Sequence, residues 1–573
     1  MNPAIIPIAT AVDFAQQHRK KPKGRQIDSR SMSEVLAVLG GETLRRDLLI
    51  EYLHLLQDHL GCLPKTHLAA LAECLKLSQT EVFEVATFYH HFDVVDSKSS
   101  VNHTLTVRLC NGPACCMAGA QGLIDQLPAL LGSTVRVQAV PCIGRCEQAP
   151  AAAVGQHEMG WANHHDIMEA AFGQHTKPLP TRHTGLAQYK AAGGYQLLHE
   201  CVTGTRTVES VIDTLSNSGL RGLGGAGFPA GKKWAIVREQ HAPRLMAVNI
   251  DEGEPGTFKD RSYLEHNPHQ FLEGMLIAAW AVQASAIYIY LRDEYHACRA
   301  MLQNELVLLK AKPPIGNMPA IELRRGAGAY ICGEESAMLE SIEGKRGLPR
   351  LRPPYVAQVG LFNKPTLVHN FETLYWVPTI LEKGASWFSK QGRHGRSGLR
   401  SYSVSGRVKK PGVHLAPTGI TLNELISEYC DGMQPGHTLY GYLPGGASGG
   451  ILPAALADVP LDFDTLQPHG CFIGSAAVVV FSQADSAVNM ARNLMRFFVH
   501  ESCGQCTPCR TGTAKALALI NQPRWNVPLL RELSAVMRDA SICGLGQAAP
   551  NPIDCVIRYF PQELESGARG SQS

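Results

Sequence analysis

The chain has 573 residues, which is too long for a single hydrophobic core, so we expect roughly three to five domains. Hydrophobic residues make up 45% of the chain and charged residues 18%, as in ordinary folded proteins. Lys and Arg number 53 against 50 Asp and Glu, and the net charge of +3 gives no reason to expect nucleic acid or an anionic membrane as a partner. No apolar run reaches about 18 residues, and the N-terminus lacks the basic start of a secretory signal. We therefore expect a cytoplasmic protein without membrane insertion.

The first third of the chain predicts a helical region followed by a small α/β domain. Residues 1–30 end in a polar, basic run that is typical of a flexible tail. Residues 31–103 carry leucine stripes at helical spacing. Residues 104–172 read as strand, cysteine loop, helix, strand and cysteine loop, and a connector rich in His, Pro and Thr occupies 173–193.

The remainder predicts a multidomain α/β protein. Residues 194–398 hold expected strands at 245–250, 286–291 and 321–324, together with two glycine-rich segments. In 399–484 a β-hairpin precedes an amphipathic helix at 422–429 and further strands, an order that suggests a ubiquitin-like (β-grasp) module. Residues 485–573 are expected to be helical.

The strongest chemical motif lies near the C-terminus. Cys503, Cys506 and Cys509 follow the pattern C-x2-C-x2-C, and Cys543 comes later in the chain. Soft thiolates from one tight loop plus a fourth cysteine suit a [4Fe–4S] cluster. A zinc site with four cysteine ligands is the alternative, although zinc ligands usually come as two separated pairs.

Two cysteine pairs mark the small α/β domain. Cys110 and Cys115 follow one expected strand, and Cys142 and Cys146 follow the next. Four thiolates at neighbouring strand ends fit a [2Fe–2S] cluster, with zinc again the alternative. Cys116 adjoins Cys115, and we expect its side chain to point elsewhere.

Glycine-rich and acid-rich loops cluster in the larger α/β region. LRGLGGAGFPAGKKW contains G-x-G-x-x-G, but a helix rather than a strand is expected before it, so it does not fit the dinucleotide fingerprint. Glycines and a lysine can still cradle a phosphate. NIDEGEPGTFKD and GAGAYICGEES also follow expected strands, where α/β sheets place ligand contacts.

These runs resemble a known family. Residues from about Gly194 to Phe560 resemble the flavoprotein subunit of respiratory complex I and its soluble relatives, through the loops above and through KPTLVHNFETL and ESCGQCTPCRTGT. Residues Ser31 to about Phe172 resemble the thioredoxin-like [2Fe–2S] subunit of the same assembly, through EVATFYHHF and PCIGRC. The fusion of both is similar to the beta (diaphorase) subunit of NAD-dependent formate dehydrogenases that contain molybdenum or tungsten.

The resemblance implies a thioredoxin-like [2Fe–2S] domain, a Rossmann-like FMN/NAD domain and a C-terminal helical bundle with the [4Fe–4S] cluster. It implies no catalytic residue beyond the flavin, with Glu254, Glu335 and Tyr330 touching the nicotinamide or flavin. Leu223 stands where complex I usually has Arg, and Ile236 where some relatives have an aromatic residue. The implied cofactor-binding residues are Gly222, Gly224, Gly225, Gly227, Phe228, Lys233, Asn249, Asp251, Glu252, Glu254, Tyr330, Gly333, Glu334, Glu335, Tyr355, His369, Asn370 and Thr373.

Nicotinamide exchanges two electrons as hydride and iron–sulfur clusters take one, so a flavin has to lie between them. We therefore predict an NAD-dependent oxidoreductase component: the NAD(H)-binding diaphorase subunit of a hetero-oligomeric formate dehydrogenase. Electrons would come from a molybdenum- or tungsten-pterin subunit through the clusters and FMN to NAD+. The alternatives are a diaphorase subunit of an NAD-reducing hydrogenase, a fused complex I flavoprotein subunit and, outside this class, a zinc-bound assembly scaffold.

Overall fold

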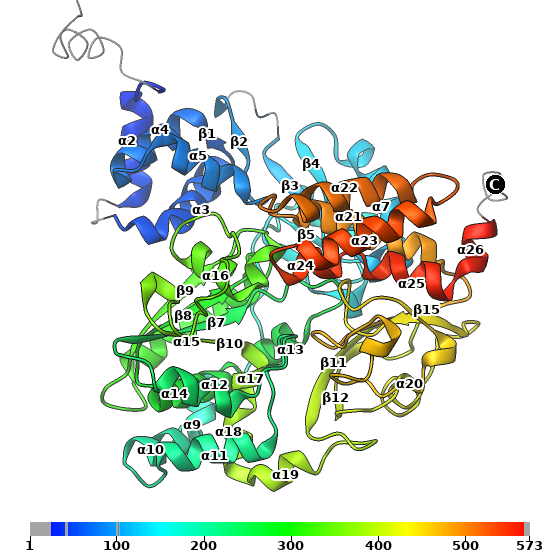
Figure 1. Cartoon of the computed structure of the whole chain (residues 1–573). Coiled ribbons are helices and arrows are strands. Elements are labelled where there is room, and N and C mark those ends of the chain that lie inside the picture. Colours follow the sequence, from blue (N-terminus) through cyan, green and yellow to red (C-terminus); the bar gives the residue numbers. More distant parts are fainter. Residues whose placement is uncertain (1–23, 41–43, 99–100, 102, 567–573) are drawn as a thin grey trace, which may run out of the picture. The chain divides into compact units, whose positions relative to one another are not determined.

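The computed structural model describes residues 24–40, 44–98, 101 and 103–566 (Figure 1). The described residues fall into two compact units that divide at residue 103. Most of the expected tail, residues 1–23, lies outside the described part. Among the described residues no helix is both long and apolar enough to cross a membrane.

The first unit is helical, as the leucine stripes predict. Gly40 and Gly61 end α2 and α3 in left-handed conformation, where glycine carries no Cβ penalty. Its elements are α2 (Ser29–Leu39), η1 (Arg46–Leu48), α3 (Leu49–Leu60), β1 (Leu63–Pro64), α4 (Lys65–Leu75), α5 (Gln79–Phe88) and β2 (Val94–Val95).

The second unit begins with a small four-stranded sheet of order β4–β3–β5–β6. Strands β3 and β4 pair in parallel, whereas β5 pairs antiparallel with both β3 and β6. The expected order of strand, cysteine loop, helix and strand is present. The elements are β3 (Leu105–Cys110), α6 (Pro113–Met117), α7 (Ala120–Leu131), β4 (Val135–Val140), η3 (Cys146–Gln148), β5 (Ala152–Val154), β6 (His157–Met159) and α8 (His164–Phe172).

The range expected as a connector, 173–193, contains a short helix and is held by hydrogen bonds. Helix α9 (Leu186–Ala191) lies inside it, and Leu186 N donates to Glu305 Oε2 at 3.2 Å. His183 Nε2 lies 2.9 Å from Glu305 Oε1. Helix α10 (Gln196–Val202) follows.

A parallel sheet of order β10–β7–β8–β9 forms the centre of the next region, drawn largely in green in Figure 1. The apolar runs of β7 and β8 fit strands that are covered on both faces. The chain winds from β7 through β8 to β9 and then returns on the other side of β7 as β10. The strand order therefore reverses direction between β7 and β10. This position is the switch point of the sheet, and α/β sheets bind ligands at the carboxyl ends of the strands there.

Around this sheet the helices supply a continuous core that includes Trp234, Phe271 and Phe371. The elements are α11 (Val208–Ser218), α12 (Ala230–Arg238), β7 (Arg244–Ile250), α13 (Lys259–His266), α14 (Pro268–Val282), β8 (Ala284–Leu291), α15 (His296–Ala311), β9 (Ala320–Arg325), η4 (Tyr330–Gly333), α16 (Glu335–Ile342), η5 (Leu361–Asn363), β10 (Thr366–Asn370), α17 (Phe371–Tyr375), α18 (Val377–Lys383) and α19 (Ala385–Ser389).

A mixed five-stranded sheet of order β12–β11–β15–β13–β14 follows. The expected hairpin is β11 with β12, and β15 pairs in parallel with β11. A capping box of Thr421 and Glu424 starts α20, which has the predicted bounds. The elements are β11 (Leu399–Gly406), β12 (Gly412–Pro417), α20 (Leu422–Tyr429), β13 (Leu439–Leu443), β14 (Leu452–Pro453), η6 (Ala454–Leu456), η7 (Gln467–His469) and β15 (Ala477–Ser482).

The last described region is helical, as expected from the sequence. Proline in the first turn starts α22, α23 and α25, where its missing N–H is not needed. The helices are α21 (Ala487–Glu501), α22 (Thr507–Ile520), α23 (Val527–Ala540), α24 (Gly544–Ala548), α25 (Asn551–Tyr559) and α26 (Pro561–Ser566).

Candidate functional site

The carboxyl ends of β7 and β10 bring several of the sequence-predicted residues together. Asn249 and Asn370 are direct partners in the parallel ladder. Asn249 Nδ2 donates to Gly333 O at 2.9 Å, which joins the end of β7 to η4. Asn370 caps α17 and also donates to Asp260 Oδ2 at 2.7 Å. The switch point of the sheet is therefore lined by polar groups from three segments.

Asp251 is a buried acid at the switch point of the sheet. It is 4% exposed, and its Oδ2 has no hydrogen-bond partner in the part of the chain that the structure describes. Burial raises the pKa of Asp251 well above its usual range. A Cβ on Gly333 would stand 3.2 Å from this oxygen, so a side chain at position 333 would crowd it. An unpartnered buried carboxyl calls for a ligand that can hydrogen-bond to it.

The first glycine loop folds back on itself above the same strand ends. Gly227 N donates to Gly222 O at 3.2 Å, and Gly222 N donates to Phe228 O at 2.9 Å. Gly225 and Gly227 have φ of 121° and 66°, which favour glycine. A Cβ on Gly224 would come within 2.9 Å of Asn370 Cβ.

Further contacts fix the loop against β10 and α17. Leu223 N donates to Thr373 Oγ1 at 2.9 Å. Lys233 Nζ, on α12, donates to Val368 O at 3.1 Å and lies 3.9 Å from Glu335. Desolvation lowers the pKa of Lys233, opposed by the charge of Glu335. A glycine cradle with one lysine beside it can hold a phosphate.

Glu254 and Tyr330 meet beside this cradle. The Tyr330 hydroxyl donates to Glu254, and Ser448 N donates to Glu254 Oε1 at 2.7 Å. Burial raises the pKa of Glu254, opposed by the hydrogen bond from Tyr330. Tyr330 N donates to Glu501 Oε2 at 2.9 Å. Glu501 begins the C-terminal cysteine motif and Ser448 lies in a glycine-rich run, but neither pattern relates them to Glu254 or Tyr330.

The second acidic pair lies at the start of α16. Glu334 caps the helix by accepting from Ser336 N and Ala337 N with Oε2, and Arg352 donates to its Oε1. Glu335 lies 3.1 Å from Arg352. The aromatic candidates Phe228 and Tyr355 are exposed, with 39% and 57% of their surface accessible. Exposed rings are available to stack on a nucleotide.

Two of the predicted cofactor-binding residues face the protein interior. Glu252, at φ 34°, accepts from Asp260 N and Arg261 N at 2.7 and 3.0 Å, capping α13. His369 is 3% exposed and accepts from Trp234 Nε1 at 2.7 Å. Neighbours in a strand point to opposite faces, so Asn370 reaches the switch point while His369 packs against α12.

The four N-terminal thiols converge between the ends of β3 and β4. Cys110, Cys115, Cys142 and Cys146 are 1%, 1%, 2% and 5% exposed. The sulfur atoms of Cys142 and Cys146 lie 3.1 Å apart. Gly112 N and Gly144 N donate to the sulfurs of Cys110 and Cys142 at 3.4 and 3.3 Å, as donors to thiolate ligands would.

Cys116 takes a different direction from its neighbour. Its sulfur lies 3.1 Å from Asn111 O and accepts from Asn493 Nδ2 at 3.4 Å. Asn493 comes from α21, so this thiol takes part in the packing of α21 near Asn111.

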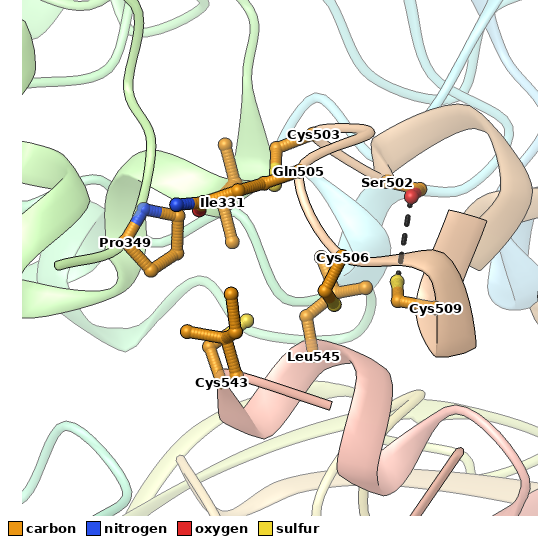
Figure 2. Close-up of a pocket in the computed structure, with 10 residues that line it drawn as sticks. Ile331, Pro349, Ser502, Cys503, Gln505, Cys506, Cys509, Cys543 and Leu545 are labelled. Atoms are coloured by element: carbon orange, nitrogen blue, oxygen red, sulfur yellow. Dashed lines mark hydrogen bonds between the residues drawn. The ribbon is translucent and has the colours of Figure 1, made fainter. Parts of the chain in front are cut away.

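The C-terminal cysteines line a small hollow. Figure 2 shows Cys503 and Cys506 on the loop before α22, Cys543 opposite them, and Ile331 and Pro349 on a further side. Ser502 Oγ and Cys509 Sγ lie 3.3 Å apart. Burial raises the pKa of Cys509 to about 11 and that of Cys543 to about 12. Because burial disfavours bare thiolates here, a positive metal group is what makes them stable ligands.

Three family models match the chain. The "Thioredoxin-like [2Fe-2S] ferredoxin" matches residues 35–171, the "Nuo51 FMN-binding domain" residues 215–379, and the "NADH-ubiquinone oxidoreductase-F iron-sulfur binding region" residues 489–567. The NADH-quinone oxidoreductase F-subunit 2 of Rhizobium meliloti is 40% identical over 395 residues, which cover 66% of this chain and 93% of that protein. The chain belongs to the family of NADH-quinone oxidoreductase F-subunits.

A mitochondrial protein and a chain of a solved assembly are also similar to this chain. The mitochondrial NADH dehydrogenase [ubiquinone] flavoprotein 1 of Dictyostelium discoideum is 40% identical over 373 residues, covering 62% of this chain and 78% of that protein. A chain in the crystal structure of an NAD+-reducing [NiFe]-hydrogenase in the H2-reduced state has a TM-score of 0.79 and 31% identity. That match covers 91% of this chain and 92% of the hydrogenase chain.

The matches confirm the expected thioredoxin-like [2Fe–2S], FMN-binding and [4Fe–4S] regions, and the chain is an oxidoreductase component of this family. They favour iron–sulfur clusters over zinc at both cysteine groups. The geometry fits an FMN: a glycine cradle with a lysine, and an unpartnered buried carboxyl at the switch point. The helical first unit belongs to the same family model as the small sheet, because that model begins at residue 35.

Proposed function

We propose that this chain transfers electrons between NAD(H) and a partner subunit through FMN and the C-terminal [4Fe–4S] cluster. The observation that carries the proposal is that η4 (Tyr330–Gly333) borders both sites. Gly333 accepts from Asn249 at the flavin candidate site, and Ile331 lines the hollow of the four thiols. One short segment thus separates the two cofactors, as rapid electron transfer requires.

Bound FMN would exchange a hydride with nicotinamide and single electrons with the cluster. The chain's own residues would bind and orient it: the glycine loop and Lys233 would hold the phosphate, and Asp251 and Asn249 would hold the rest of the FMN. The proposed FMN contacts are Gly222, Gly224, Gly225, Gly227, Lys233, Asn249, Asp251, Tyr330, Gly333, Glu334, Asn370 and Thr373. Phe228, Glu254, Glu335 and Tyr355 are proposed for NAD(H).

The proposed metal ligands are two sets of four. Cys503, Cys506, Cys509 and Cys543 would hold the [4Fe–4S] cluster, and Cys110, Cys115, Cys142 and Cys146 the [2Fe–2S] cluster. All 17 cysteines are free of disulfide bonds, which supports a reducing, cytoplasmic location.

We also infer that residues 399–484 are a ubiquitin-like module. The hairpin β11–β12, the helix α20 after it, and β15 inserted in parallel beside β11 support this. Its Ser448 reaches Glu254, so the module contributes to the nucleotide site.

The FMN site can be tested with a matched pair of glycine variants. Gly224→Ala places a Cβ 2.9 Å from Asn370 Cβ, whereas Gly316→Ala meets nothing within 4 Å. We expect the first variant to lose most of its FMN, measured by flavin fluorescence after denaturation, and the second to keep it. Equal FMN content in both variants would contradict the placement of the flavin.

For the partner we propose a molybdenum- or tungsten-pterin subunit that oxidises formate, as the sequence resemblance implies. The fusion of both cluster modules with a complete set of four N-terminal cysteines supports it. A hydrogenase partner is the second candidate, since a chain of an NAD+-reducing [NiFe]-hydrogenase resembles this one over 91% of its length.

The two partners are distinguished by purifying the native complex and measuring NAD+ reduction with formate and, separately, with hydrogen. We expect reduction with formate and none with hydrogen, and molybdenum or tungsten by metal analysis. Reduction with hydrogen, nickel in the preparation and no response to formate would replace the first partner by the second.

A further inference from the structure

Two buried arginines from the flavin region reach the loop that carries Cys142 and Cys146. Arg292 follows β8, is 5% exposed, and donates from Nη2 to Cys142 O at 2.7 Å. Arg261, on α13, is 3% exposed and donates from Nε to Gly144 O at 2.8 Å. Two carbonyls of the cysteine loop that have turned inward are therefore held by guanidinium groups.

The same arginines hold Glu252, the residue next to Asp251. Arg292 Nη1 donates to Glu252 O at 2.7 Å, and Arg261 N donates to Glu252 Oε2 at 3.0 Å. Tyr295 OH donates to the same carboxylate oxygen at 2.7 Å. One continuous set of hydrogen bonds thus joins the flavin candidate loop to the cysteine loop.

The fit between these segments leaves little room for movement. Gly144 has φ of 78°, and a Cβ there would stand 2.4 Å from Tyr295 Cε1. The aromatic ring therefore lies directly against the backbone of the cysteine loop.

The charges around the two arginines differ. Arg261 is paired with Glu147 and with Glu265, the latter at 2.7 Å. Arg292 pairs with Glu294 at 3.1 Å, and the side chain of Glu294 is 26% exposed. Arg292 is therefore the buried cation whose charge is less fully neutralised at the cysteine loop.

We propose that Arg292 is a positioning residue for the [2Fe–2S] cluster and that its charge favours reduction of that cluster. Its two terminal nitrogens bridge the carbonyls of Cys142 and Glu252 and fix the cysteine loop against the flavin site. Cluster reduction adds one negative charge, which a buried cation stabilises. The proposal rests on the proposed function, because it requires an iron–sulfur cluster on the four N-terminal thiols.

The test is a redox titration of the purified native complex followed by EPR, for Arg292→Gln, Arg292→Lys and Arg407→Gln. Arg407 is a matched control, since it also pairs with a carboxylate, Asp485 at 2.7 Å, but in the mixed sheet. We expect Arg292→Gln to move the midpoint of the [2Fe–2S] signal to more negative potential. The [4Fe–4S] midpoint should not change in any variant, and the control should match the unmodified protein throughout.

Arg292→Lys separates charge from geometry, because lysine keeps the charge but lacks the planar fork. We expect a midpoint near that of the unmodified protein and slower appearance of the reduced [2Fe–2S] signal after rapid mixing with NADH. If the Gln variant loses its cluster, the Lys variant decides alone, and a reduction rate equal to that of the unmodified protein overturns the proposal.

An unchanged midpoint in a Gln variant that retains its cluster also overturns it, while leaving the proposed function intact. Zinc in place of iron at the N-terminal thiols of the unmodified protein would instead overturn the assignment of that cluster, and the role of Arg292 with it.

Discussion

The two cysteine clusters of this chain differ in how they are enclosed. The four N-terminal thiols are all buried, and arginines from a separate region hold the backbone of their loop. At the C-terminal cluster only Cys509 is buried, whereas Cys503, Cys506 and Cys543 are partly exposed around a hollow.

The difference in burial between the two cysteine groups suits them to different roles in electron transfer. A cluster enclosed by the flavin region is suited to exchange electrons with the flavin alone. A cluster in a hollow with partly exposed ligands can exchange electrons with the flavin on one side and with a partner protein on the other. We therefore expect the C-terminal cluster to be the obligatory route and the N-terminal cluster to be a side store.

The largest expected effect comes from breaking the C-terminal cluster. Cys506→Ser should remove the [4Fe–4S] EPR signal and abolish NAD+ reduction by the partner's substrate, because the route is cut. NADH oxidation with an artificial dye should persist, since FMN remains. An intact [4Fe–4S] signal in this variant would show that Cys506 is not a ligand.

The N-terminal cluster allows a sharper pairwise test with adjacent cysteines. Cys115→Ser should remove the [2Fe–2S] signal, whereas Cys116→Ser should keep it, because Cys116 points to Asn111 and Asn493. Partner-driven NAD+ reduction should survive in both variants if this cluster is a side store. Its loss in Cys115→Ser with FMN and the [4Fe–4S] signal retained would place the N-terminal cluster on the main route.

Much of this arrangement follows from local sequence patterns. The helix Leu422–Tyr429 has the bounds that the sequence predicts, and the strand predicted at 245–250 is β7. Short-range spacing also places Cys503, Cys506 and Cys509 on one loop, and each N-terminal pair after one strand, whereas the fourth ligand Cys543 and the meeting of the two pairs depend on the fold.

The contacts between segments could not be predicted in this way. Arg292 is 150 residues from Cys142, and Ser448 is 194 residues from Glu254, so no local periodicity relates them. Glu252 shares a motif with Asp251, but its backbone turn directs the carboxylate to α13. A polar residue directly after a parallel strand, as Arg292 is after β8, is the signal that could have suggested it.

The difference in enclosure also predicts the order in which iron is lost. An iron chelator together with a mild oxidant should remove the [4Fe–4S] signal before the [2Fe–2S] signal, because buried thiols restrict access. The time courses of both EPR signals in one sample measure this. Loss of the [2Fe–2S] signal first, or of both together, would contradict the assigned difference in enclosure.

The smallest expected effect concerns Glu252, whose contacts with Arg261, Arg292 and Tyr295 form the buried junction beside the N-terminal cluster. Burial, reinforced by the charge of Asp260, raises the pKa of Glu252 from 4.5 to about 7. Between these values the folded protein holds a proton that the unfolded chain has released, so stability falls as pH rises through this window. The slope is at most about 1.4 kcal/mol per pH unit from this group.

Glu252→Gln keeps the shape and an oxygen that can accept from Asp260 N, but it cannot ionise. Relative to the unmodified protein, this variant should gain about 1–3 kcal/mol in stability as pH rises from about 5 to about 8. Thermal unfolding measured across that range gives the difference, with Glu209→Gln on the exposed first turn of α11 as the control that follows the unmodified protein. A pH-independent difference in stability between Glu252→Gln and the unmodified protein would mean that Glu252 is ionised in the folded state throughout this range. The buried junction beside the [2Fe–2S] loop would then carry one more negative charge than a protonated Glu252 gives it.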